Sequence, residues 1–162
     1  MNHNYFTQQD VERLEAQAVQ IRKDIVSMIH DAGAGHPGGS LSAVEIITAL
    51  YFHVMRIDPA RPAWSERDRF ILSKGHSCPA LYAALARRGY FDPALLGTLR
   101  RYHSILQGHP DMNKTPGVDM TAGSLGNGLS AGVGMALSAR LHRQDYTTYV
   151  MLGDGEIQEG LV

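Results

Sequence analysis

Apolar residues recur at steps of three and four near the start of the chain, which is the spacing of one face of an α-helix. The residues with this spacing are Val11, Leu14, Ala18, Ile21, Ile25 and Met28. Thr7 precedes them as a candidate N-cap, and Gly33 and Gly35 follow them as a helix end. The pattern predicts a long amphipathic helix between Thr7 and Gly33.

Further helices are marked by caps and by glycine or proline at their ends. Ser42 and Glu45 have the spacing of a capping box, which predicts a helix whose apolar face carries Ile46, Ile47, Leu50, Tyr51 and Val54. Three more helices are predicted at 79–88 before Gly89, after Asp92-Pro93, and at 128–143. Small residues alternate with apolar ones in the last of these, so we expect it to pack very closely on its neighbour.

Two short apolar runs have the character of strands. They are 69–73 and 147–152, and the second leads directly into Gly153. Strands that alternate with helices predict an α/β fold with a parallel sheet, whose functional loops lie at the carboxyl ends of the strands. Residues 103–122 are rich in glycine, proline, asparagine and aspartate, and predict a long ordered loop of the kind that is usually functional.

Composition narrows the class of protein. The 162 residues suffice for one domain, and a formal net charge of −1 gives no reason to expect nucleic acid or an anionic membrane as a partner. Cys78 is the single cysteine, so no internal disulfide can form. The polar segment 1–10 lacks the apolar core of a signal peptide. A single domain over 1–162 in a cytoplasmic protein is expected.

The segment Gly153-Asp154-Gly155-Glu156 follows the second strand and predicts a cation site. A carboxylate between glycines suits magnesium or calcium, which prefer oxygen ligands, and glycine lets a phosphate approach the backbone closely. A metal there would neutralise a diphosphate and fix its position. The alternative is a strand-to-helix turn in which Asp154 is only an N-cap.

A glycine-rich stretch, 121–128, precedes the last predicted helix. Free N–H groups at a helix N-terminus attract anions, and glycines allow backbone contacts to a cofactor ring. It is not the dinucleotide-binding fingerprint, because no strand leads into it and its glycine spacing differs. The alternative is a turn followed by a tightly packed helix.

Three histidines, His36, His76 and His109, each stand beside a glycine in a different loop. Converging imidazoles suit a substrate whose hydroxyl groups must be bound and protonated. A zinc site competes with this interpretation, although the short ligand pairs of zinc sites are missing. Among nearby residues, Cys78 is expected to be inert and Lys74 to be solvated rather than bound to phosphate, and Arg100 and Arg101 to lie on a solvated helix face.

Taken together, these segments resemble the transketolase family. The matching motifs occur in the family's order: Gly-His-Pro-Gly at 35–38, Ser-Lys-Gly-His at 73–76, Gly-His-Pro at 108–110, Gly-Ser-Leu-Gly-Asn-Gly at 123–128 and Gly-Asp-Gly-Glu-Ile-Gln-Glu-Gly at 153–160. The Gly-Gly-Ser-Leu-Ser stretch after His36, and Ser124, are most similar to the split form, whose amino- and carboxyl-terminal halves are separate chains.

The resemblance implies a partial thiamine diphosphate-binding fold and the transfer of a two-carbon ketol unit between sugar phosphates. By position, His36, His76 and His109 resemble the catalytic histidines around the thiazolium carbon and the sugar hydroxyls. The cofactor contacts implied are His76, Gly123, Ser124, Leu125, Asp154, Gly155 and Glu159. Asp154 matches the ligand of magnesium or calcium, and Glu159 an acid that links the two active sites of a dimer.

The sequence also departs from the family pattern. Asn127 stands where the family often has glutamine, and the family's metal-binding asparagine and carbonyl would lie beyond Val162. The glutamate and aromatic pocket for the aminopyrimidine ring belong to the next domain. We therefore expect a fold that is incomplete at the carboxyl terminus, inactive alone, and completed by a carboxyl-terminal half in a homodimer or a two-plus-two assembly. The alternatives are a non-catalytic interaction fragment and another thiamine diphosphate enzyme, such as deoxyxylulose-phosphate synthase.

Overall fold

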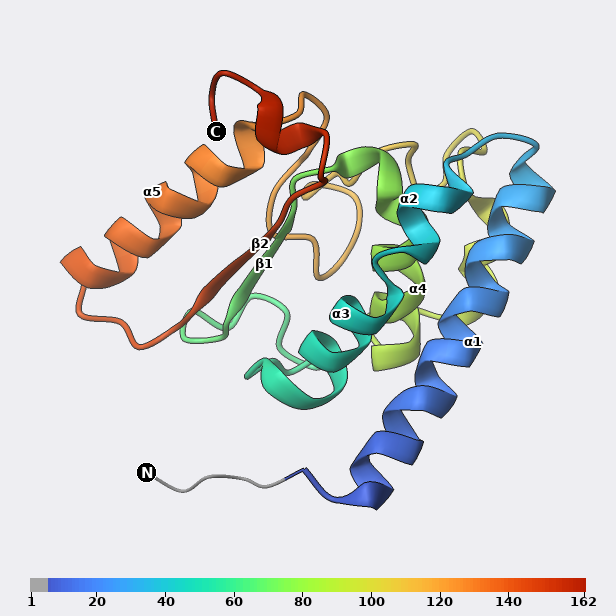
Figure 1. Cartoon of the computed structure of the whole chain (residues 1–162), viewed down its shortest axis with the longest axis horizontal. Coiled ribbons are helices and arrows are strands. Elements are labelled where there is room, and N and C mark those ends of the chain that lie inside the picture. Colours follow the sequence, from blue (N-terminus) through green and yellow to red (C-terminus); the bar gives the residue numbers. More distant parts are fainter. Residues whose placement is uncertain (1–5) are drawn as a thin grey trace.

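A two-stranded parallel sheet lies between two groups of helices in the computed structural model, which describes residues 6–162 (Figure 1). The strands are β1 (Arg69–Leu72) and β2 (Thr148–Met151). They pair from Arg69 opposite Thr148 to Leu72 opposite Met151. The predicted α/β fold, a parallel sheet flanked by helices, is confirmed. Residues 1–5 of the polar segment without a signal-peptide core lie outside the described residues.

The helical segments differ in type and length. In chain order they are α1 (Gln8–Ala32), α2 (Pro37–Leu41), α3 (Val44–Ala49), the π-helix η1 (Leu50–Val54), the 3₁₀ turn η2 (Gly75–Ser77), α4 (Cys78–Arg88), the 3₁₀ helix η3 (Pro93–Thr98), α5 (Asn127–Leu141) and the 3₁₀ turn η4 (Glu156–Gln158). Helices α1 to α4 lie on one side of the strands and α5 on the other (Figure 1). Within residues 6–162, no helix is both long and apolar enough to cross a membrane.

Alternate residues of β1 pack on opposite faces of the sheet, as the pleat of a strand requires. Phe70 and Leu72 join the hydrophobic core formed with α1, α3 and α4. On the other face, a Cβ added at Gly132 of α5 would lie 2.3 Å from Val150 Cγ2 and 3.7 Å from Ile71 Cδ1. Helix α5 therefore packs almost backbone to sheet, and the expected close packing of this helix is confirmed.

Helix α1 forms as its apolar pattern predicts. The Thr7 side chain accepts a hydrogen bond from the Asp10 backbone N–H, and the Asp10 carboxylate accepts one from the Thr7 N–H, so the N-terminus has a reciprocal capping box. Gly33 ends the helix in the left-handed conformation with φ 63°. Its buried face packs on α4, in which nine consecutive residues from Cys78 to Ala86 are buried.

Two local predictions are wrong. Ser42 does not cap the second helix: it is the C-cap of the unpredicted α2, and its hydroxyl donates to the Gly39 carbonyl at 3.0 Å. Helix α3 follows at once from Ala43 without any side-chain cap, and the Ala43 N–H donates to the Ser40 carbonyl of α2. Arg100 and Arg101 are exposed but lie in a turn after η3, where Arg100 has φ 62°, and not on a helix.

The long loop after η3 is ordered by side chains from the core. The Tyr82 hydroxyl of α4 lies 3.0 Å from the carbonyl oxygens of both Gln107 and His109. The Asp119 carboxylate accepts a hydrogen bond from the Phe70 N–H at 2.8 Å and forms an ion pair with Arg67. The predicted functional loop is therefore fixed against α4 and the start of β1.

Candidate functional site

A cleft of ≈ 390 Å³ lies where the carboxyl ends of both strands meet α2 and the glycine-rich loop. Ligands in open α/β sheets bind at this end of the strands. The lining comes from four separate segments and comprises Gly38, Gly39, Ser42, Lys74, His76, Leu125, Gly153, Asp154, Gly155 and Glu156. The fold thus brings residues of four of the five sequence motifs to one place.

Lys74 is the cation of this cleft, and it is buried rather than solvated as expected. Only 7% of the residue is exposed, and its Nζ donates to the Gly39 carbonyl at 3.0 Å and to Ser42 Oγ at 3.2 Å. Burial lowers the pKa of Lys74, while the nearby charges of Asp154 and Glu156 act in the opposite direction. An ammonium has three N–H donors, so one remains for an anion in the cleft.

Asp154 lies on the exposed rim of the same cleft, in the turn after β2. The N-cap of η4 is Gly155, and no side chain caps that turn. The alternative in which Asp154 acts as a helix cap is therefore wrong. Among residues 6–162, no group of three or more His, Cys, Asp or Glu side chains could hold a metal ion, so Asp154 offers one carboxylate rather than a complete protein site.

Glu156 is a functional candidate to which the sequence assigned no role. Its carboxylate is buried at 2% exposure and accepts hydrogen bonds from Ser73 Oγ, from the Gly126 N–H at 2.8 Å and from the Gly153 N–H at 2.9 Å. Burial alone would raise its pKa, but these hydrogen bonds outweigh burial and hold the pKa below its usual value. The group is therefore an anion at neutral pH that joins three loops.

Of the three predicted histidines, His76 lines the cleft, and His36 and His109 are not among its lining residues. The rings of His36 and His76 have centroids 5.1 Å apart in an edge-to-face arrangement. The pKa of His76 is lowered, first by burial and then by the nearby basic side chains of His36, Lys74 and His109. The pKa of His109 is lowered by burial and then by Arg100 and His36. Both rings are thus neutral at physiological pH, and each can donate and accept one hydrogen bond.

Glycine is required where α2 approaches the second histidine loop. A Cβ added at Gly39 would lie 2.8 Å from Ser77 Oγ and 3.3 Å from His76 Nε2. Any larger residue at this position would therefore require the Ser77 or His76 side chain, or the backbone, to shift. Gly39 therefore allows α2 to pack closely against the segment that carries His76.

Some predicted residues lie outside the lining of the cleft. Gly123 and Ser124 are exposed in the glycine-rich loop, and Glu159 is exposed beyond η4, so only Leu125 of that loop lines the cleft. Cys78 is buried, and burial raises the pKa of its thiol to about 12, which agrees with an inert cysteine.

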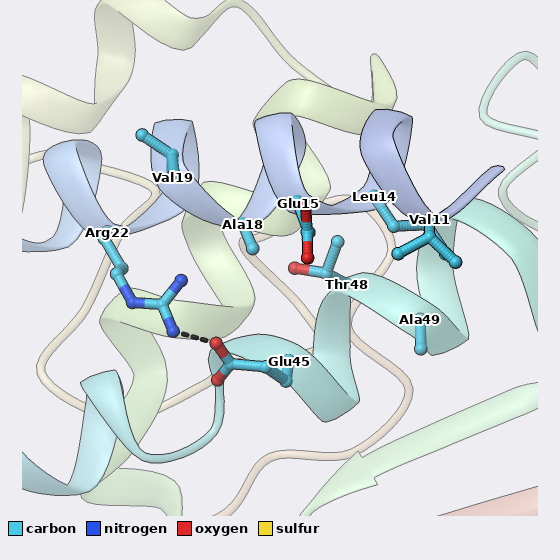
Figure 2. A pocket seen from close by; sticks show the side chains of 9 residues that line it. All are labelled: Val11, Leu14, Glu15, Ala18, Val19, Arg22, Glu45, Thr48 and Ala49. Carbon is cyan, nitrogen blue, oxygen red and sulfur yellow. Dashed lines mark hydrogen bonds and ion pairs between the residues drawn. The ribbon is translucent and has the colours of Figure 1, made fainter. Parts of the chain in front are cut away.

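A second and more apolar groove, of ≈ 520 Å³, lies between α1 and α3 (Figure 2). Val11, Val19 and other apolar side chains form most of its lining, and an ion pair between Arg22 and Glu45 closes one end. It shares no residue with the cleft at the strand ends and offers no histidine or free carboxylate pair. The candidate site is therefore the cleft.

Residues 14–162 match the family described as transketolase, thiamine diphosphate binding domain. The 6-deoxy-6-sulfo-D-fructose transketolase subunit SqwG of Clostridium sp. (strain MSTE9) is 54% identical over 92% of this chain and 54% of its own length. An apulose-4-phosphate transketolase subunit of Phocaeicola vulgatus is 47% identical over 94% of this chain and 54% of its own length. The chain thus spans about half the length of these relatives.

The fold agrees with solved structures of the same group. Transketolase from Pichia stipitis in complex with sedoheptulose 7-phosphate superposes with a TM-score of 0.86 at 37% identity, over 91% of this chain and 23% of that one. Transketolase from Leishmania mexicana gives 0.85 at 35% identity, over 91% and 24%. Fold and sequence therefore point to the same group of proteins.

Proposed function

We propose a function from the family to which the chain belongs, the transketolase family, whose thiamine diphosphate-binding domain it matches over residues 14–162. In this proposal the cleft at the strand ends holds the diphosphate of the cofactor and a divalent cation. The observation that supports the proposal best is that a buried ammonium, Lys74, and a carboxylate on the rim, Asp154, line the same cleft. A cation bound by Asp154 would bridge to phosphate oxygens, and Lys74 would neutralise further charge.

The residues present fit such a group. Gly38 and Gly155 line the cleft, and a Cβ at either would meet nothing within 4 Å, so each leaves open space beside the backbone for an oxygen-rich ligand. Lys74 uses only neutral acceptors within the protein and keeps a donor for an anion. Asp154 would be one ligand of magnesium or calcium, with the remaining ligands supplied by phosphate, water and other parts of the whole protein.

His36, His76 and His109 are proposed to bind and protonate the sugar. Since His76 and His109 are neutral at physiological pH, each can accept a proton from one substrate hydroxyl and donate to another. When bound, thiamine diphosphate supplies the electron sink that lets a carbon–carbon bond beside a ketone break. Gly123, Ser124 and Leu125 would contact it through the backbone, and Glu159 would join a network to a second active site.

For the whole enzyme we propose transfer of a two-carbon ketol unit between sugar phosphates. The remainder of the site would come from a carboxyl-terminal half, in a homodimer or a two-plus-two assembly. Two of the relatives act on apulose 4-phosphate and 6-deoxy-6-sulfo-D-fructose, by their names, so the sugar differs within this group. A cytoplasmic location remains a prediction.

The test is reconstitution of turnover. The chain is completed with the carboxyl-terminal half of a related two-chain transketolase, and ketol transfer is followed in a coupled sugar-phosphate assay with thiamine diphosphate and magnesium. We expect turnover that needs both halves, and a large loss for His76→Ala but not for the exposed helix variant His30→Ala. Turnover by the isolated chain, or unchanged turnover in His76→Ala, would contradict the proposal.

A further inference from the structure

Glu156 connects three chain segments that meet at the cleft. Its Oε1 accepts from Ser73 Oγ at the end of β1 and from the Gly126 N–H in the glycine-rich loop. Its Oε2 accepts from the Gly153 N–H at the end of β2. The partners lie 83, 30 and 3 positions away along the chain. One carboxylate therefore fixes the relative positions of segments that are far apart in the sequence.

The cost of burying this charge argues for a specific role. An ionised carboxylate with 2% exposure is stable only when its oxygens are hydrogen-bonded, and here a side chain and two backbone amides satisfy it. Both amides belong to glycines, whose backbone is intrinsically free to adopt many conformations, so these hydrogen bonds help to fix both segments. Gly126 has φ 83° and precedes α5 directly, so the same bond fixes the start of that helix.

We infer that Glu156 is a positioning residue, which sets the spacing between the glycine-rich loop, the turn that carries Asp154, and the β1 end that carries Lys74. The inference rests on the proposed function, because the spacing matters only if these three segments together form a diphosphate site. A site preorganised in this way loses less ordering entropy when its ligand binds. Glu156 acts through Lys74 and Asp154, which are proposed to hold the diphosphate and its cation.

Glu156→Gln is the variant that tests the inference. Glutamine has the same shape, but it places an NH₂ group where one carboxylate oxygen accepted a hydrogen bond. At least one of the three groups that donate to Glu156 would then face a second donor instead of an acceptor. Residues that hold ligand-binding groups in place typically change affinity by ~10–100-fold when they are altered. We expect the Kd for thiamine diphosphate at saturating magnesium to rise by that factor, with kcat at saturating cofactor unchanged.

The experiment has two readouts, one of which needs no cofactor. Hydrogen–deuterium exchange of this chain should speed up in segments 123–127 and 153–155 of Glu156→Gln, while α1 and α4 stay unchanged. Calorimetry and kinetics of the completed enzyme give Kd, kcat and the KM for the cofactor. Glu156→Asp keeps the negative charge but has a side chain shorter by one methylene, so this variant should also bind thiamine diphosphate more weakly. Glu66→Gln, an exposed acid far along the chain, is the matched control.

The outcomes separate the two proposals. If the completed wild-type enzyme binds no thiamine diphosphate, the proposed function fails, and the inference fails with it. If the wild type binds but Glu156→Gln or Glu156→Asp binds equally well, or if local exchange is unchanged, only the positioning role is overturned. Should Glu156→Gln not fold, Ser73→Ala removes one of the three donors, and an unchanged Kd in that variant overturns the role as well.

Discussion

The contact between α5 and β2 allows a matched pair of substitutions in one helix. Gly132 and Gly134 both lie in the interior of α5, yet their surroundings differ. A Cβ at Gly132 would lie 2.3 Å from Val150 Cγ2, whereas a Cβ at Gly134 would meet nothing within 4 Å. Gly132→Ala and Gly134→Ala therefore share the change in helix propensity and differ only in packing.

The magnitudes follow from these two effects. Replacing glycine by alanine inside a helix stabilises a protein by about 1 kcal/mol. An extra methyl in a tight contact costs about 1–3 kcal/mol, and valine gives way poorly because its χ1 is restricted. We therefore expect Gly134→Ala to gain about 1 kcal/mol and Gly132→Ala to lose up to about 2 kcal/mol, a difference of about 1–3 kcal/mol in the free energy of unfolding.

Urea denaturation and thermal melting of this chain measure the difference. At about 3 °C per kcal/mol for a domain of this size, the two variants should differ in Tm by roughly 3–9 °C, with Gly132→Ala the lower. An unchanged m-value would show that the substitutions change stability without changing the surface exposed on unfolding. Equal stabilisation by both alanines would refute the close approach of α5 to the sheet, and with it the placement of the glycine-rich loop.

Three further predictions concern titration, reactivity and an ion pair. Because burial and nearby basic groups lower the pKa of His76, its NMR titration should have a midpoint below 6.5. The unfolded chain then binds the proton more readily than the folded one, so the free energy of unfolding should fall as the pH drops from above 6.5 towards that midpoint. A midpoint above 6.5 is the contrary result. Cys78, with a pKa of about 12, should react with iodoacetamide at neutral pH only in denaturant, and rapid native labelling would show an accessible thiolate. Asp24 accepts two hydrogen bonds of 2.7 Å from Arg87. Asp24→Asn should therefore lower the free energy of unfolding, measured by urea denaturation, by about 1.5–3 kcal/mol. A loss under about 0.5 kcal/mol would mean that the ion pair contributes little to stability.

The sequence predicted those parts of the fold that depend on local patterns. The first helix, its caps at Thr7 and Gly33, and both strands follow from spacing and from glycine chemistry that neighbouring residues alone decide. The cap at Ser42 failed because the preceding residues form a short helix of their own, and the capping-box spacing carries no information about that.

Some of the residues that line the cleft were singled out from the sequence, and others were not. His76 and Asp154 stand out because they accompany glycines at predicted strand ends, and both line the cleft. Lys74 was expected in solvent, since its burial depends on α2, which is 35 residues distant and covers it. Glu156 lies in the segment predicted to bind a cation but was given no role of its own, because its partners at 73 and 126 are brought together only by tertiary structure.

The most direct test of the proposed site is calorimetry of thiamine diphosphate binding to the completed enzyme, with and without magnesium. Asp154→Asn keeps the shape of the side chain and removes the charge that a cation needs, and Asp31→Asn on the exposed end of α1 is the control. We predict magnesium-dependent binding in the wild type and the control, and a loss of about 10–100-fold or more in Asp154→Asn. Wild-type affinity and wild-type magnesium dependence in Asp154→Asn would contradict the assignment of this cleft.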